Sequence, residues 1–146
     1  MRQEPIQSVE LSTIAHATED TNRVDRALQS LLEDIPQQLT RQYLEGHHGN
    51  PIVRIEVKLT SEDASQFAYS LIGKLSASER LILLRDLRLH SDEDGNLYIR
   101  IDKQGLLQGT FQIADDDPIR VKIKFNRLIG DCKKSMARFL ESERIG

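Results

Sequence analysis

The sequence predicts an α+β domain, in which a mainly antiparallel β-sheet carries helices packed on one of its faces. Several segments alternate apolar and polar residues with a period of two, while others space apolar residues three and four positions apart. Turn-forming residues separate these segments. Each clear strand has one apolar face, whereas strands buried on both faces do not alternate in this way. We therefore expect a β-meander with one covered face and one open face.

The clearest strand lies at 119–125, where apolar and basic residues alternate without a break. Every residue of its open face is basic, namely Arg120, Lys122 and Lys124. The inward residues are Ile119, Val121, Ile123 and Phe125. A strand with a basic stripe on its open side indicates a surface for a polyanion.

The N-terminal part of the chain predicts a strand followed by a helix. Residues 6–17 alternate, although Ile14 departs from the pattern. The hydroxyl and the two acidic groups at 18–20 are typical of a helix start, because their oxygens accept the first free N–H groups. We expect this helix to end at Pro36.

The next segments predict two strands at 39–46 and 52–59, joined by a turn that contains Gly-Asn-Pro. A second helix is expected from 60 to 75. Ser76 and Glu79 then form a capping box, which predicts that a third helix follows at once.

The C-terminal half begins with a polar turn at 92–96 and ends with a helix. The other expected elements are a strand at 97–101, a short helix at 103–108, a brief strand at 111–113, an acidic turn at 115–118, the basic strand, and a last helix whose apolar stripe runs from Leu128 to Leu140. Since there is no repeat, linker or low-complexity tract, we expect residues 1–146 to form a single domain.

Composition and charge narrow the class of protein. The net charge of the 146-residue chain is −3, but residues 119–146 contain eight basic and three acidic residues. This uneven distribution of charge is consistent with a polyanion-binding surface. It is equally consistent with two parts of one fold whose net charges differ by chance. One cysteine, Cys132, suits a reducing compartment. No segment approaches 18 consecutive apolar residues, so we expect a cytoplasmic protein without a membrane span.

The open face of the predicted sheet is the strongest candidate site. Lysine and arginine side chains along neighbouring strands can meet successive phosphates, and an aromatic ring can stack on a base. The predicted residues are Arg54, Lys58, Tyr98, Arg100, Arg120, Lys122 and Lys124. The alternative is a solvated face whose cations pair with acids such as Glu56.

Metal and cofactor signals are weak. The four histidines, His16, His47, His48 and His90, lack the short patterned spacing of a zinc site. There is no glycine-rich phosphate loop, no nucleophile elbow and no zinc-protease helix. We therefore expect no metal, no cofactor and no enzyme active site.

Three stretches together resemble one archaeal family. They are His-Ala-Thr-Glu-Asp at 16–20, Glu-Gly-His-His-Gly-Asn-Pro-Ile at 45–52, and Leu-Tyr-Ile-Arg-Ile-Asp-Lys-Gln at 97–104 with Gly109 beyond it. The family consists of small proteins described as RNA-binding and predicted to be associated with the exosome. The resemblance covers roughly residues 6–126 and implies a fold similar to that of the ribosomal protein that contacts 5S ribosomal RNA.

The resemblance implies a module that binds single-stranded or structured RNA without sequence specificity. Within its motifs, His47 and Asn50 offer donors in a tight connection, and Lys103 could present its charge to a phosphate. Two alternatives stay open. One is a protein-interaction subunit of an RNA-processing assembly without direct RNA contact. The other is an enzyme acting on phosphodiesters with His47 or His16 and a carboxylate.

Overall fold

The computed structural model describes residues 5–16, 19–33, 35, 39–46 and 49–142. Its strands are β1 (Ile6–Ala15), β2 (Leu39–Glu45), β3 (Pro51–Thr60), β4 (Asn96–Asp102) and β5 (Pro118–Phe125). Its α-helices are α1 (Thr21–Leu32), α2 (Ser61–Lys74), α3 (Ala77–Arg85), α4 (Lys103–Leu107) and α5 (Cys132–Leu140). The described ranges also contain the 3-10 helices η2 (Leu87–Leu89) and η3 (Arg127–Ile129).

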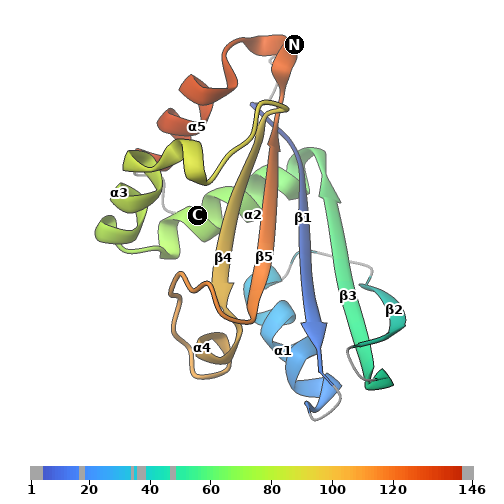
Figure 1. Ribbon diagram of the computed structural model, residues 1–146. Coiled ribbons are helices and arrows are strands. Elements are labelled where there is room, and N and C mark those ends of the chain that lie inside the picture. Colours follow the sequence, from blue (N-terminus) through green and yellow to red (C-terminus); the bar gives the residue numbers. More distant parts are fainter. Residues whose placement is uncertain (1–4, 17–18, 34, 36–38, 47–48, 143–146) are drawn as a thin grey trace. The chain divides into compact units, whose positions relative to one another are not determined.

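The five strands form one antiparallel sheet in the order β2-β3-β1-β5-β4 (Figure 1). The predicted α+β class, with helices packed on the sheet, is confirmed. The strand order is not a simple meander, because β1 lies between β3 and β5. The chain leaves β1 through α1 and re-enters the sheet at the edge strand β2, which pairs with β3.

Two compact units divide the chain. Unit 1 comprises Met1–Val9, Leu59–Ile99 and Lys122–Gly146, and unit 2 comprises Glu10–Lys58 and Arg100–Val121. The boundaries fall inside four of the strands, so β1, β3, β4 and β5 each contribute residues to both units.

Unit 1 holds α2, α3 and α5, with a core rich in aromatic and branched side chains. Phe125 of β5 meets Phe139 of α5 edge to face, with 5.8 Å between ring centroids. The predicted capping box is confirmed at the start of α3, where Ser76 and Glu79 satisfy each other's backbone N–H groups. No helix in the described part of the chain has the length and hydrophobicity needed to cross a membrane.

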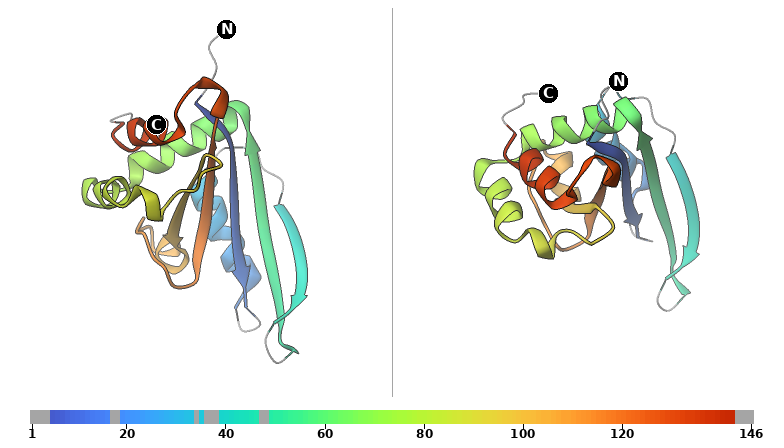
Figure 2. Two further views of the ribbon diagram at one scale, coloured as in Figure 1. Left: turned by 45° about the horizontal axis from the view of Figure 1, so that its top comes forward. Right: turned by 90° about the horizontal axis from the view of Figure 1, so that it is seen from above.

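Unit 2 holds α1, α4 and the edge strand β2, which lies beside β3 in each view of Figure 2. The predicted helix start is confirmed, since the carboxylate of Asp20 accepts a hydrogen bond from the backbone N–H of Asn22. Arg41 of β2 pairs with Asp25 of α1, which ties the edge strand to the helix.

The alternation of β1 continues through Ile14, the residue that interrupts the apolar pattern. Thr13 takes the inward position there, at 3% exposure, and its hydroxyl donates to the carbonyl of Pro118. Ile14 consequently lies on the open side and is half-buried. A hydroxyl with an internal acceptor can occupy a core position without an unsatisfied hydrogen-bonding group.

The last helix begins later than its apolar pattern predicts. Leu128 and Ile129 lie in η3 instead of the stripe of α5, and Leu128 is 87% exposed. Gly130, at a φ of 134°, ends η3, and Asp131 caps the start of α5. The prediction that the apolar stripe begins at Leu128 is therefore wrong, because an α5 that begins at Cys132 leaves Leu128 outside the helix.

Candidate nucleic-acid interface

The predicted cationic residues lie on the strand positions that alternate with the buried core. In unit 2 these exposed residues are Arg54 and Lys58 of β3, Arg100 of β4 and Arg120 of β5. In unit 1 they are Lys122 and Lys124 of β5, which are half-buried, with Tyr98 of β4. The alternation is confirmed; contact with RNA stays a prediction.

The cations of β3 and β4 each have an acidic neighbour. The pairs are Arg54 with Glu56 at 2.8 Å, Lys58 with Glu10 at 4.0 Å, and Arg100 with Asp115 at 3.6 Å. Ion pairs that are at least partly exposed, as these are, contribute about 0–1 kcal/mol, so a phosphate can replace the acid at small cost. This part of the surface matches the alternative of a solvated face with internal pairs.

The cations of β5 differ from those of the neighbouring strands. Among the residues that the structure describes, no hydrogen bond or ion pair joins Arg120, Lys122 or Lys124 to another side chain. A phosphate can therefore bind these three groups without displacing an acidic partner found in the described ranges.

Tyr98 lies on the open side of β4 at 37% exposure, and its hydroxyl donates to Asp92 at 2.8 Å. Burial and this hydrogen bond raise the pKa of Tyr98, so the phenol stays protonated at neutral pH. The carboxylate of Asp92 also accepts from the backbone of Asp94 and from the backbone and side chain of Asn96. The polar turn thus holds the hydroxyl of Tyr98 in one place.

Tyr43 of β2 is a second tyrosine of the sheet, but it does not share the open side with Tyr98. It pairs in register with Val53, and Leu39 of the same strand pairs with the buried Val57. Directly opposed residues of antiparallel strands point to the same face. Tyr43 therefore points to the core-facing side at the sheet edge, while Leu44 shares the side of Arg54.

Lys103 is a correction to the predicted site. Its side chain is 1% exposed, and its ammonium donates to the carbonyl of Ile14 at 2.8 Å and to Glu19 at 3.0 Å. Asp117 lies 2.9 Å from the same ammonium. The ammonium of Lys103 therefore lies inside unit 2, where contacts with three oxygens offset the cost of removing its charge from water. It does not face an external phosphate.

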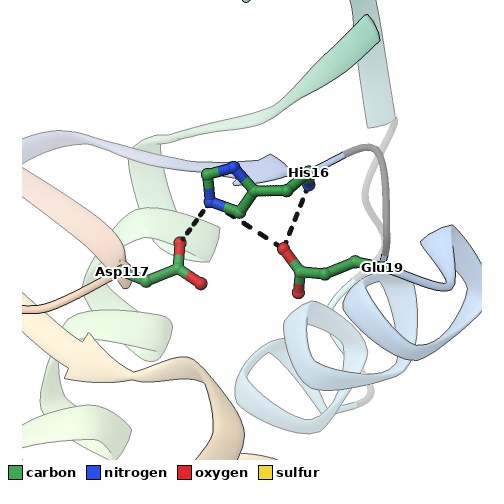
Figure 3. Close-up of side chains that lie close together, drawn as sticks. All are labelled: His16, Glu19 and Asp117. Carbon is green, nitrogen blue, oxygen red and sulfur yellow. Dashed lines mark hydrogen bonds and ion pairs between the residues drawn. The ribbon is translucent and has the colours of Figure 1, made fainter. Parts of the chain in front are cut away.

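His16 joins this buried cluster from its solvent side. Its Nε2 lies 3.1 Å from Asp117 and 3.9 Å from Glu19. Figure 3 shows the imidazole between the two carboxylates. Burial alone would raise the pKa of Asp117, but the hydrogen bonds and charges of Lys103 and His16 lower it. The cluster therefore links the end of β1, the start of α1 and the turn before β5.

The same cluster has the residue types of a metal site. Donor atoms of His16, Glu19 and Asp117 lie within 4.8 Å of one another. The ammonium of Lys103, however, lies within 3.0 Å of both carboxylates. A second cation beside it would be repelled, so the geometry favours an internal ion pair.

The remaining predicted residues belong to the turn between β2 and β3. His47 lies outside the described residues. Asn50 is exposed, and its backbone carbonyl accepts from Gly46 at 2.6 Å, which closes the turn. Gly49 has a φ of 75°, a conformation that suits glycine. The backbone of Asn50 has a turn role, and its side chain stays a candidate contact.

Unit 2 also contains a cavity of about 470 Å³ on the open side of its strands. Arg54 and Arg120 line it together with His16 and Ser12, so the structure brings these two predicted cations to one place. The acidic turn 115–117 lines it too. Sequence patterns indicate that turn, but they do not predict that it stands beside two arginines.

Comparisons with known proteins identify the family to which the chain belongs. The sequence model of a family described as RNA binding matches residues 8–125. The chain is 34% identical to the RNA-binding protein PAB1135 of Pyrococcus abyssi over 123 residues, which is 80% of each protein.

Solved structures extend the similarity to the fold. Protein AF2318 from Archaeglobus fulgidus, a DUF54 protein, has a TM-score of 0.79 and 32% identity, with 92% of this chain and 99% of that one covered. Protein SSO0741 from Sulfolobus solfataricus, also DUF54, has a TM-score of 0.76 and 25% identity, with 92% and 97% covered.

Proposed function

Because the chain belongs to this RNA-binding family, we propose that it binds RNA through the cationic side chains on the open side of its strands. The observation that carries the proposal is the set of three β5 cations, Arg120, Lys122 and Lys124, for which the described residues supply no acidic partner. Such groups can neutralise phosphates and release counterions.

The paired cations of β3 and β4 extend the proposed contact surface. Since these ion pairs are at least partly exposed to solvent, phosphates can replace the acidic partners at a cost of about 1 kcal/mol or less. Arg54, Lys58 and Arg100 would then add contacts, and Tyr98 would stack on an unpaired base. The side chain of Asn50 would lie at the rim.

This surface favours the RNA backbone over its sequence, because charged groups outnumber groups that read base edges. We propose single-stranded or structured RNA as the ligand, in the cytoplasm. We propose binding without catalysis, because the matching family and the curated relative are both described by RNA binding. Cleavage of RNA by the purified protein would contradict that assignment.

The first experiment is a fluorescence anisotropy titration of labelled single-stranded RNA with the purified protein alone, at 50 and 200 mM salt. Three to six phosphate contacts predict that log K falls with log salt at a slope of about −2 to −4. Absence of binding at 50 mM, or affinity that does not depend on salt, would contradict the proposal.

A second candidate is a protein-interaction role within an RNA-processing assembly, such as the exosome. Exposed apolar side chains of unit 1 favour it: Leu81 is 60% exposed, Leu89 82% and Leu128 87%. A protein that fails to bind RNA alone, yet copurifies with processing enzymes after nuclease treatment, would favour this candidate.

A further inference from the structure

The cavity of unit 2 combines two kinds of charge, which a simple phosphate groove does not need. Its volume of about 470 Å³ lies within the range of small-ligand pockets. Arg54 and Arg120 reach it from β3 and β5, while Asp115 and Asp116 reach it from the turn before β5. A ligand that suits both sides carries an anionic group and hydrogen-bond donors on one small frame.

The cationic side has an available group. Arg120 has no acidic partner in the described ranges, and Arg54 shares its guanidinium with Glu56. The hydroxyl of Ser12 also lines the cavity. Two guanidinium groups with a hydroxyl form a donor set that suits a phosphate.

The acidic side has one available acceptor. Asp117 is committed to Lys103 and to His16, whose contact with it is drawn in Figure 3. Asp115 pairs with Arg100, which lies outside the cavity lining. Asp116 is exposed, and the described residues supply no partner for it. Its carboxylate can accept two parallel hydrogen bonds from a ligand.

Apolar contacts complete the cavity. Ile14 and Leu44 line it, and both lie on the open side of their strands. Branched side chains in such a place can pack against the ring of a base or a ribose. The cavity thus offers contacts for the phosphate, the ring and the donor edge of a nucleotide.

We propose that this cavity is a nucleotide subsite that takes one unstacked guanine of the bound RNA. Arg54 and Arg120 hold its phosphate, and Asp116 accepts from its N1–H and N2–H groups. Guanine is favoured because its two donors point in one direction, as the two oxygens of a carboxylate do. Uracil instead places a carbonyl on each side of its single N–H, and those oxygens would face the carboxylate.

The inference rests on the proposed RNA-binding function and deepens it. The test uses labelled oligouridine of ten nucleotides and the same oligonucleotide with one central guanine, each titrated with the full chain at 50 and 200 mM salt. We expect the guanine-containing RNA to bind about tenfold tighter or more, the discrimination typical of one good bidentate pair.

The variant Asp116→Asn should lose most of that preference and keep the salt dependence, because an amide presents a donor where guanine needs an acceptor. Asp94→Asn is the matched control: the side chain of Asp94 is 79% exposed, and it lies in unit 1. This control should keep both the preference and the salt slope. A two-dimensional amide NMR spectrum of each variant confirms that the fold is retained.

The outcomes separate the two proposals. Equal affinity of the two RNAs with a clear salt slope overturns the guanine subsite and leaves RNA binding in place. An unchanged preference in Asp116→Asn overturns the role of that carboxylate. No binding of either RNA at 50 mM salt overturns the proposed function and the subsite with it.

Discussion

Removal of the three β5 cations is the sharpest perturbation of the proposed RNA surface. Arg120, Lys122 and Lys124 lie on one strand and alternate with the fully buried Val121 and Ile123. If each neutralises one phosphate of a single strand, the triple alanine variant should shift the slope of log K against log salt by about +2. When salt rises from 50 to 200 mM, the factor by which the affinity of the variant falls should be about 20 times smaller than the factor for the unchanged protein.

The assay is the same anisotropy titration, repeated at four or more salt concentrations. The matched control removes three exposed cations from helical segments, with the substitutions Arg85→Ala, Arg88→Ala and Lys134→Ala. It changes the net charge by the same amount, so it reports the effect of overall charge on binding. Thermal unfolding of both variants should stay close to that of the parent, because surface substitutions usually change stability by about 0.5 kcal/mol or less.

Two results would refute the reasoning. A triple variant with an unchanged slope would mean that β5 does not contact phosphates. An equal change in slope in the control would mean that net charge, and not the position of the cations, governs the interaction.

Three further predictions concern the groups that support the site. Lys103→Met should destabilise the fold by about 2–3 kcal/mol in urea unfolding, because it leaves two carboxylates facing each other without their cation; an unchanged midpoint would contradict this. Partial burial alone would raise the pKa of Asp92, but hydrogen bonds from Asn96, Tyr98 and Asp94 lower it from 3.8 to about 2. Asp92→Asn should therefore lower the free energy of unfolding by about 1 kcal/mol at pH 7, after allowance for solvent screening. The difference between variant and parent should narrow as the pH falls from 3.8 to about 2, because the parent then loses the charge of Asp92. A difference that stays constant over this range would mean that the charge of Asp92 does not stabilise the fold. Gly105→Ala should lower the melting temperature, because its Cβ would lie 2.7 Å from the hydroxyl of Thr110, and an unchanged melting temperature would mean that the short helix relaxes freely.

The sequence predicted local structure well where one physical rule decides it. The alternation of 119–125 required one buried face, and the Ser76–Glu79 box required a helix start. The apolar spacing gave a wrong start for the last helix at Leu128. The helical period of apolar residues continues across Gly130, but the backbone of Gly130 does not continue a helix. Ile14 appeared to interrupt the alternation because a polar residue, Thr13, takes the buried position before it. The sequence could not show this, since the hydroxyl of Thr13 donates to a carbonyl 105 residues away.

The functional groups divide in the same way. Which residues face away from the core follows from the period of a strand, so the open-side cations were predictable. Whether a given charge is free or paired depends on which distant segments meet. Lys103 has the sequence context of an exposed phosphate contact, yet it is buried among Ile14, Glu19 and Asp117.

By itself, the sequence determined the α+β class, the one-sided strands and the basic character of β5, because these depend on neighbours within a few residues. Tertiary structure alone decided the strand order, the burial of Lys103 and the meeting of Arg54 and Arg120 in one cavity with the acidic turn. Such contacts join segments far apart in the chain. Their energies depend on distances and burial, which no local pattern of residues contains.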